Sequence, residues 1–241
     1  MAEINCSGSC RNNEDRYCFM RHNEAVRMDI LKRHILNGVD IPCADGVLIA
    51  GDCEIGAGTV ILPGTIIFSK TKIGKNCIIG PNSRLEGCSV GDGSKINASQ
   101  CEYSTIGNGV SVGPFSHLRP HTVVENGVHA GNFVEIKNSV VGENTSVSHL
   151  TYIGDSDVGK GVNIGCGCAT ANYDGTKKYR TKIGDKVFVG CHTCMVAPVE
   201  LGNRSYTAAG SVITENVPEG TMAIARSRQT IKRKVRKYKD D

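Results

Sequence analysis

The sequence has no tryptophan, only 5% aromatic residues, and no apolar run near the roughly 20 residues that a membrane-spanning helix needs. Its first eleven residues are polar and lack the apolar core of a secretory signal peptide. These absences predict a soluble, cytoplasmic protein with no membrane partner. Twelve cysteines are present, and without a signal peptide we expect free thiols rather than a disulfide framework.

The net charge of +4 is unevenly distributed. Residues 226–241 contain eight Lys or Arg and two Asp, which leaves 20 basic and 22 acidic residues elsewhere. The basic character therefore belongs to a C-terminal tail, residues 223–241, and we expect no nucleic-acid partner. Cys6, Cys10 and Cys18 lack the spacing of zinc ligands, so we expect no metal.

An aliphatic residue followed by glycine recurs along the chain, mostly at multiples of six residues or within one or two residues of one. A six-residue period fits neither an α-helix, with about 3.6 residues per turn, nor a meander of hairpins. It fits a coil in which each unit supplies one short strand and one corner, and three units close one triangular turn. The sequence therefore predicts an all-β fold, a parallel β-helix over residues 47–222. Known prisms of this type are left-handed, and we expect that hand.

Two segments depart from the repeat. Within residues 1–46, the stretch 23–37 has apolar residues at helical spacing, and Gly38 suits the left-handed conformation that follows many helices. We expect an amphipathic helix that covers the open end of the prism, with apolar positions at Val26, Ile30, Leu31 and Ile35. Residues 170–182 are polar and contain Asp-Gly, which predicts a loop pushed out of the prism.

Spacing also predicts which side chains meet. Arg119 and Lys137 are separated by three six-residue units, which is one full turn, so they should stack on adjacent coils of one face. Two cations about 4.8 Å apart repel each other unless an anion lies between or beside them, and a phosphate would suit that place. A solvated basic ladder is equally compatible with the spacing. His117, Glu135 and Tyr152, also about one turn apart, should form the neighbouring column.

Polar motifs within the repeats, taken in order, resemble one family. The motifs are Gly113-Pro-Phe-Ser-His-Leu-Arg-Pro, Gly131-Asn-Phe-Val-Glu-Ile-Lys, His149-Leu-Thr-Tyr-Ile-Gly-Asp, Asn163-Ile-Gly and Asn172-Tyr-Asp-Gly. They are similar to the acetyltransferase half of the bifunctional bacterial enzymes that join glucosamine-1-phosphate N-acetyltransferase to N-acetylglucosamine-1-phosphate uridyltransferase. The resemblance covers residues 21–229.

This resemblance implies a homotrimer that moves an acetyl group from acetyl-CoA to the amine of glucosamine-1-phosphate. The product would lead to UDP-N-acetylglucosamine and cell-wall peptidoglycan. In the family a nucleotide-binding domain precedes the helix, and this chain starts where that domain would end. We therefore expect neither uridyltransferase activity nor the magnesium that it uses.

The resemblance also implies roles for individual residues. The residue matching His149 is the general base that takes a proton from the sugar amine, and Glu135 would orient and polarise it. The phosphate would be held by Arg119, Lys137, Tyr152 and Lys178, and the sugar hydroxyls and amine by Asn163 and Asn172. Acetyl-CoA is expected in a groove between neighbouring prisms, flanked by Cys166, Cys191 and Ala209, with Arg226 on its phosphates. The backbone N–H of Cys191 is the expected oxyanion donor.

Cys166 and Cys191 would share a corner on successive coils if residues 170–182 form one six-residue unit plus an outward loop. We hypothesise that oxidation of this pair blocks the acetyl-CoA groove. The alternative is that two reduced thiols simply fill positions for small residues.

Three other functions stay open at this stage. One is a hexapeptide acyltransferase that acts on another amino sugar or on a hydroxyl. Another is a zinc enzyme similar to the trimeric carbonic anhydrases, although the spacing does not bring three histidines to one corner; the candidates are His117, His121, His129, His149 and His192. The third is a non-catalytic partner of a separate uridyltransferase.

Overall fold

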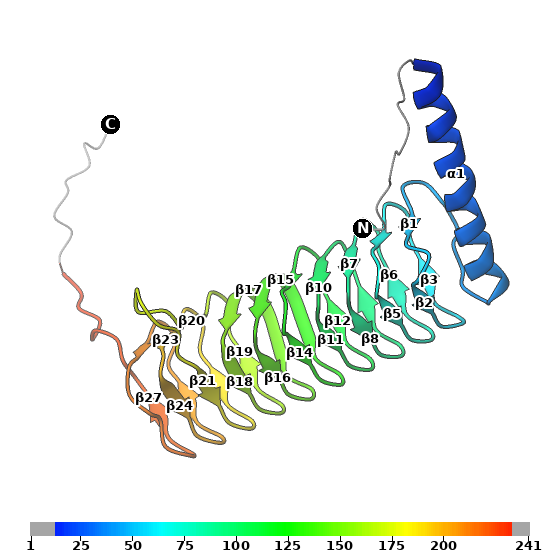
Figure 1. The fold of residues 1–241 in the computed structure, drawn as a ribbon. Coiled ribbons are helices and arrows are strands. Elements are labelled where there is room, and N and C mark those ends of the chain that lie inside the picture. Colours follow the sequence, from blue (N-terminus) through cyan, green and yellow to red (C-terminus); the bar gives the residue numbers. More distant parts are fainter. Residues whose placement is uncertain (1–12, 233–241) are drawn as a thin grey trace, which may run out of the picture.

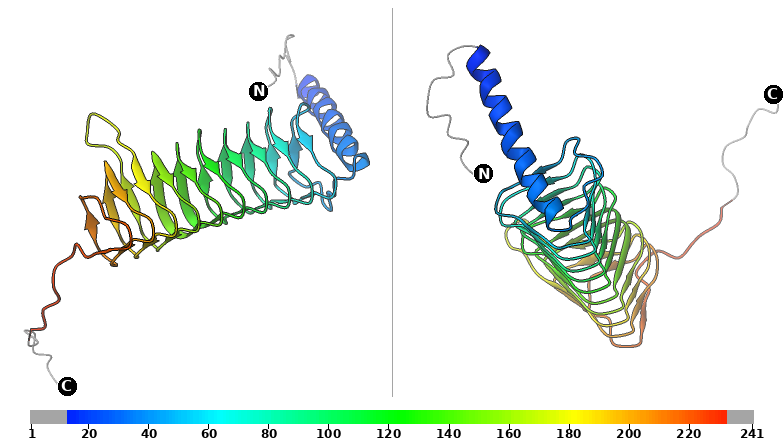
Figure 2. Two further views of the ribbon diagram at one scale, coloured as in Figure 1. Left: turned by 90° about the horizontal axis from the view of Figure 1, so that it is seen from below. Right: turned by 90° about the vertical axis from the view of Figure 1, so that its right-hand side faces the viewer.

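The computed structural model describes the backbone of residues 13–232 and the side chains of residues 21–232. One helix, α1 (Asn13–Leu36), precedes about ten coils of a β-helix in which all the strands pair in parallel (Figure 1). Viewed along its axis the β-helix has a triangular section (Figure 2, right). The parallel β-helix predicted from the six-residue period is confirmed, and so is the left hand expected from known prisms of this type.

The strands lie on three faces, and each coil contributes one short strand to each face. The first face contains β1 (Leu48–Ile49), β4 (Ile66–Ile67), β7 (Arg84–Glu86), β10 (Gln100–Glu102), β13 (His117–Leu118), the second halves of β15 (His129–Lys137) and β17 (Ser146–Gly154), β20 (Ala169–Ala171), β23 (Cys194–Val196) and β26 (Val212–Ile213).

The second face contains β3 (Val60–Ile61), β6 (Ile78–Ile79), β9 (Lys95–Ile96), β12 (Ser111–Val112), the first halves of β15 and β17, β19 (Asn163–Ile164), β22 (Phe188–Val189), β25 (Tyr206–Thr207) and β27 (Met222–Ala223). The third face contains β2 (Glu54–Ile55), β5 (Lys72–Ile73), β8 (Ser89–Val90), β11 (Thr105–Ile106), β14 (Val123–Val124), β16 (Val140–Val141), β18 (Ser156–Val158), β21 (Thr181–Ile183) and β24 (Val199–Leu201). Because β15 and β17 continue around one corner, the first two faces form a single sheet.

The core is a stack of mostly aliphatic side chains that the strands turn inward. Ile61, Ile79 and Ile96 are register partners on successive coils, and all three are fully buried. The corners need small residues: a Cβ added at Gly56 would lie 2.7 Å from the backbone of Gly74. Buried hydroxyls donate hydrogen bonds to backbone carbonyls. Thr59, for example, donates to the Gly74 carbonyl at 2.8 Å.

Helix α1 begins at Asn13, earlier than the expected start at residue 23, and ends at Leu36. Gly38 follows it with φ +87°, as expected for the residue after a helix. Of the four apolar positions, only Leu31 is fully buried and Ile30 is packed against the core, whereas Val26 and Ile35 are exposed. The apolar stripe is therefore narrower than expected. The helix lies across the N-terminal end of the prism (Figure 2, right), where the Arg27 guanidinium donates to the Ala44 and Val47 carbonyls at 3.0 Å.

The expected loop is present between β20 and β21. Residues 172–180 project from the prism (Figure 2, left), and the parallel register resumes on both sides of them. Beyond β27 the chain leaves the prism as a tail (Figure 1). The side chains of Cys6, Cys10 and Cys18, and the part of the basic tail after Lys232, lie outside the described residues.

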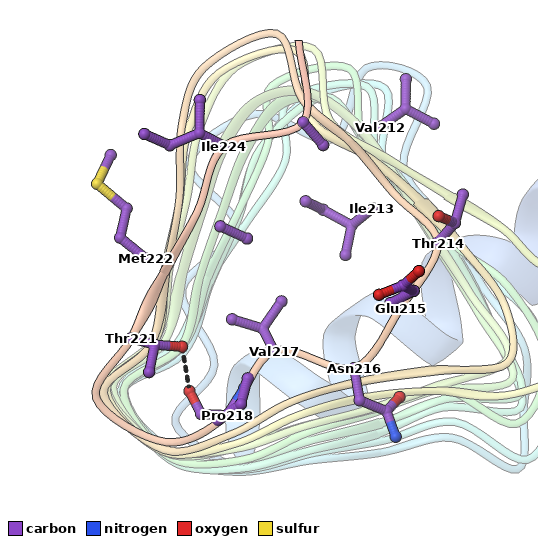
Figure 3. A pocket seen from close by; sticks show the side chains of 12 residues that line it. Val212, Ile213, Thr214, Glu215, Asn216, Val217, Pro218, Thr221, Met222 and Ile224 are labelled. Carbon is purple, nitrogen blue, oxygen red and sulfur yellow. Dashed lines mark hydrogen bonds between the residues drawn. The ribbon is translucent and has the colours of Figure 1, made fainter.

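A cavity of about 350 Å³ opens at the C-terminal end of the prism. Figure 3 shows Ile213 and Val217 pointing into the triangular interior of the last coil. Thr221 donates to the Pro218 carbonyl at 2.7 Å and closes the turn beside it. This cavity is the open end of the solenoid core. Within residues 13–232, no helix is both long and apolar enough to cross a membrane.

Candidate active site

Two columns of polar side chains follow the first face at mid-length. His117, Glu135 and Tyr152 are consecutive register partners on β13, β15 and β17. Arg119 and Lys137 lie two residues after His117 and Glu135. They are stacked on successive coils, because the residues just before them, Leu118 and Ile136, are register partners. The predicted one-coil spacing thus places these five side chains on one face.

The hydrogen-bond partner of Glu135 differs from the expected one, which was His149. Glu135 accepts a hydrogen bond from Arg119 at 2.8 Å, and among the described side chains no hydrogen bond or ion pair joins Glu135 to His149. His117 turns the other way, with Nε2 3.7 Å from Glu102 of β10. Glu135 therefore orients the arginine in this structure rather than the histidine.

Three cations gather at the edge of the first face. Lys178, on the projecting loop, reaches back to Lys137 and lowers its pKa, and desolvation and the charge of Arg119 lower it further. A lysine whose pKa falls because of other cations lies in a local excess of positive charge. Such an edge favours a bound anion, and a phosphate accepts hydrogen bonds from several cations at once.

Asp155 holds the base of the loop. Its side chain is only 5% exposed and accepts hydrogen bonds from the amides of Asn138, at 2.5 Å, and Asn172. Burial raises the pKa of Asp155, but the two amides and then the charges of Lys137 and Lys178 outweigh it and hold the pKa below its ordinary value. The amide of Asn172 is thus fixed by a carboxylate at the base of the loop.

This clamp was missed in the sequence, although a signal for it exists. Asn138, Asp155 and Asn172 follow one another at equal intervals in the sequence, and each interval is one coil. Three short polar side chains at one-coil spacing predict a stacked corner. Asn138 and Asp155 also have positive φ values of 47° and 48°, the conformation that Asn and Asp tolerate best among residues other than glycine.

A third column runs along the corner between the second and first faces. Val147, Ile164, Val189 and Thr207 are consecutive register partners. The residues two positions further on are therefore stacked on successive coils: His149, Cys166, Cys191 and Ala209. Arg226 completes this line, because a Cβ added at Gly210, next to Ala209, would lie 3.9 Å from the Arg226 Cδ.

The corner column is accessible. His149, Cys191, Ala209 and Arg226 are exposed and Cys166 is half-buried. A cavity of about 430 Å³ lies beside it, lined by residues of β15, β17 and β20, among them Glu135 and Tyr152, and by Cys168 and His192 at the corner. The cavity connects the first face to the corner.

Apolar side chains project from the same corner. Phe115 and Phe133 stack with their ring centroids 5.5 Å apart, and Leu150 lies on the next coil. Each of the three is about 60% exposed, at 62%, 58% and 59%. A row of exposed apolar residues beside a polar site is typical of a surface that another molecule covers.

Asn163 is the expected substrate residue that does not join the others. It lies on the second face, in register with Ser146 and Phe188, whereas the cations lie on the first face. Within one chain the structure brings together Arg119, Lys137, Lys178, Tyr152 and Asn172, and it places Asn163 around the corner. No group of three or more His, Cys, Asp or Glu suited to hold a metal lies among residues 21–232.

Comparisons with known proteins agree with this architecture. A family model described as the hexapeptide repeat of succinyl-transferase matches residues 70–98 and 180–215. The solved structure of an Arabidopsis UDP-N-acetylglucosamine acyltransferase superposes with a TM-score of 0.61 over 74% of this chain and 69% of that one. At 16% identity this likeness concerns the fold alone.

Curated relatives are much closer in sequence. The bifunctional protein GlmU of Caldanaerobacter subterraneus subsp. tengcongensis is 54% identical over 209 residues, which cover 87% of this chain and 46% of that protein. GlmU of Thermoanaerobacter pseudethanolicus is 55% identical over 207 residues, covering 86% and 45%. GlmU of Acetivibrio thermocellus is 52% identical over 218 residues, covering 90% and 47%.

The chain thus contains hexapeptide repeats of the kind that the family model describes, and over most of its length it is similar to the acetyltransferase half of the GlmU proteins. It spans about half the length of the curated relatives it matches.

Proposed function

We propose that this protein transfers the acetyl group of acetyl-CoA to the amine of glucosamine-1-phosphate and releases N-acetylglucosamine-1-phosphate and CoA. The observation that carries this proposal is the cluster of Arg119, Lys137 and Lys178 on one edge, next to the coil that carries His149. We place the reaction in the cytoplasm, on the route to UDP-N-acetylglucosamine.

The cation cluster would bind the phosphate of the sugar. Arg119 is held by Glu135 and offers its remaining N–H donors, while Lys137 and Lys178 contribute two compact positive charges. Tyr152 is in register with Glu135 and adds a phenol hydroxyl on the same face. Because the cations repel one another when the site is empty, a phosphate dianion gains more here than a neutral hydroxyl would.

His149 would act as the general base. The sugar amine attacks the thioester carbonyl carbon through its lone pair, and the imidazole accepts the proton that the amine must lose. Asn172 is fixed by Asp155 at the base of the loop and would hold the sugar through its amide oxygen. Asn163 would contact the sugar from the other face of the corner.

The corner column of Cys166, Cys191, Ala209 and Arg226 would bind acetyl-CoA. Among residues 13–232, no carbonyl or side chain accepts a hydrogen bond from the backbone N–H of Cys191, so it is free to stabilise the oxyanion of the tetrahedral intermediate. When that intermediate collapses, the carbon–sulfur bond breaks, the CoA thiolate leaves, and the imidazolium returns its proton. Arg226, at the end of the column, would pair with the CoA phosphates.

We propose that the protein acts as a homotrimer with a site between neighbouring prisms. Asn163 lies on the second face and the cations on the first, so one chain does not surround the substrate alone. The exposed Phe115, Phe133 and Leu150 would be covered by a second copy. Light scattering tests this proposal, and a monomer with full activity would contradict it.

The test of the activity is an assay of CoA thiol release with glucosamine-1-phosphate beside one with free glucosamine. We expect rapid release with the phosphorylated sugar and little with the other, because free glucosamine leaves the cation cluster unpaired. Equal rates would contradict the phosphate site. Acetylation of another amino sugar phosphate in preference would point to a related acyltransferase. A parallel assay with UTP and N-acetylglucosamine-1-phosphate tests the expectation that uridyl transfer does not occur.

A further inference from the structure

Cys166 and Cys191 are direct neighbours in the corner column. Their strands are in register, because Ile164 pairs with Val189 two residues before them. The backbone N–H of His192 donates to the Cys166 carbonyl at 2.7 Å, which continues that pairing through the corner. Neighbouring parallel strands are about 4.8 Å apart, inside the range of about 4.4–6.8 Å between Cα atoms of a disulfide.

The other cysteines nearby lack this arrangement. Cys168 is buried, donates its thiol to the Gly190 carbonyl at 3.2 Å, and has its pKa raised by burial to about 11. Cys194 lies on the first face, where its register partner is Ala169. In the described part of this column, a half-buried and an exposed cysteine therefore lie on successive coils, and both are reduced.

A histidine lies on the other side of the pair. His149 is the register neighbour of Cys166 one coil earlier, because Val147 pairs with Ile164. An imidazole on the adjacent coil is placed to accept the thiol proton, and the thiolate is the form that attacks an oxidant. Cys166 would therefore react first, and Cys191 is placed to resolve it.

We propose that Cys166 and Cys191 form a disulfide when the protein meets hydrogen peroxide, and that this disulfide closes the edge where acetyl-CoA binds. The Cys166 thiolate attacks one oxygen of the peroxide, the O–O bond breaks, and a sulfenic acid and hydroxide form. The Cys191 thiol then attacks the sulfenic sulfur, and the disulfide forms with release of water. Two thiols are oxidised and one peroxide is reduced.

The second half of this inference, that the disulfide closes the edge where acetyl-CoA binds, rests on the proposed function. Cys166 and Cys191 lie between His149 and Ala209, in the middle of the column that would hold the acetyl-CoA arm. A covalent bridge there ties the two side chains together at the point where the thioester must lie. Acetyl-CoA, when bound, would in turn shield both thiols from the oxidant.

The test is peroxide treatment of the full chain, followed by blocking of free thiols and peptide mass spectrometry. We expect a linked peptide pair containing Cys166 and Cys191, lower in mass by two hydrogen atoms. We also expect at least a tenfold loss of acetyl transfer that dithiothreitol restores, and slower formation of the linked pair with saturating acetyl-CoA. Cys166→Ala and Cys191→Ser should each abolish the reversible loss, with each variant compared with its own untreated activity. Cys194→Ser is the matched control and should respond as the wild type does.

Two outcomes would overturn the inference. One is the absence of the linked pair at a peroxide dose that oxidises both thiols, and this result would leave the proposed function standing. The other is a linked pair that leaves acetyl transfer unchanged, which would refute the claim that the disulfide closes the acetyl-CoA edge. A linked pair that forms equally fast with acetyl-CoA present, in a protein that does transfer acetyl groups, would refute the placement of the acetyl-CoA arm and with it the second half of the inference.

Discussion

Replacing Asp155 with asparagine perturbs the clamp at the base of the loop with little change in shape. Each oxygen of the Asp155 carboxylate accepts a hydrogen bond from one side-chain amide, Oδ1 from Asn138 and Oδ2 from Asn172. In Asp155→Asn one of these oxygens becomes an NH₂ group, which faces another NH₂ donor. One hydrogen bond to a charged group is lost and a buried donor is left unpaired, at a cost of about 2–3 kcal/mol.

That cost should divide between stability and binding. Expressed fully in stability it corresponds to a fall of about 5–10 °C in melting temperature for a chain of this size. Expressed fully in substrate binding it is about 30- to 150-fold in KM for the amino sugar phosphate. The KM for acetyl-CoA should change little, because the corner column of Cys166 and Cys191 does not contact Asp155.

Asp157→Asn is the matched control for the clamp. Asp157 lies two residues further along and pairs with Arg180 at the end of the same loop, but this pair is half-exposed and is worth at most about 1 kcal/mol. Thermal melting and steady-state kinetics of both variants give the comparison. If Asp155→Asn matches the wild type in both measurements, or Asp157→Asn has the larger effect, the reasoning about the clamp is refuted.

The clamp also predicts a pH dependence. The pKa of Asp155 lies below its ordinary value of 3.8 in the folded protein, so the carboxylate stabilises the fold above that value. This stabilisation is lost as the pH falls below 3.8 towards the lower folded-state pKa. Unfolding in acid should therefore be less steep in Asp155→Asn than in the wild type, and equal slopes would contradict the assignment.

Three further substitutions test other parts of the molecule. His149→Ala should lower kcat by about 10²-fold or more with a small change in either KM, because it removes the proton acceptor; a non-catalytic scaffold would be unaffected. Lys137→Ala should erase most of the preference for glucosamine-1-phosphate over free glucosamine, measured as the ratio of their kcat/KM values. Ile136→Ala, in the fully buried stack, should destabilise the protein by about 2–5 kcal/mol in denaturant titration.

The solenoid made much of the site predictable from residue numbers alone. Because each coil returns to the same place after a nearly constant length of chain, the spacing of Arg119 and Lys137 was enough to place them on one face. The same counting placed Cys166 beside Cys191 once the loop was set aside. A fold without this fixed period would not have allowed either inference.

Other features needed the structure because they depend on side-chain direction or on the loop. Glu135 pairs with Arg119 on the neighbouring coil, whereas the resemblance had assigned it to His149. The resemblance had grouped Lys178 with Lys137, but residue spacing alone could not, because Lys178 approaches Lys137 from the loop outside the repeat. Helix α1 starts at Asn13, ahead of the apolar spacing at residues 26–35 from which the helix was predicted.

The loop between β20 and β21 shows how such a rod can acquire new chemistry. Ala169 and Cys194 are register partners although the whole loop lies between them in the sequence, so the extra length is absorbed at one corner and the pairing on both sides is undisturbed. Evolution can lengthen, shorten or exchange this segment at little cost to the scaffold. Under the proposed function, changes in this loop would alter the preference among acceptor sugars while the column that would bind acetyl-CoA is kept.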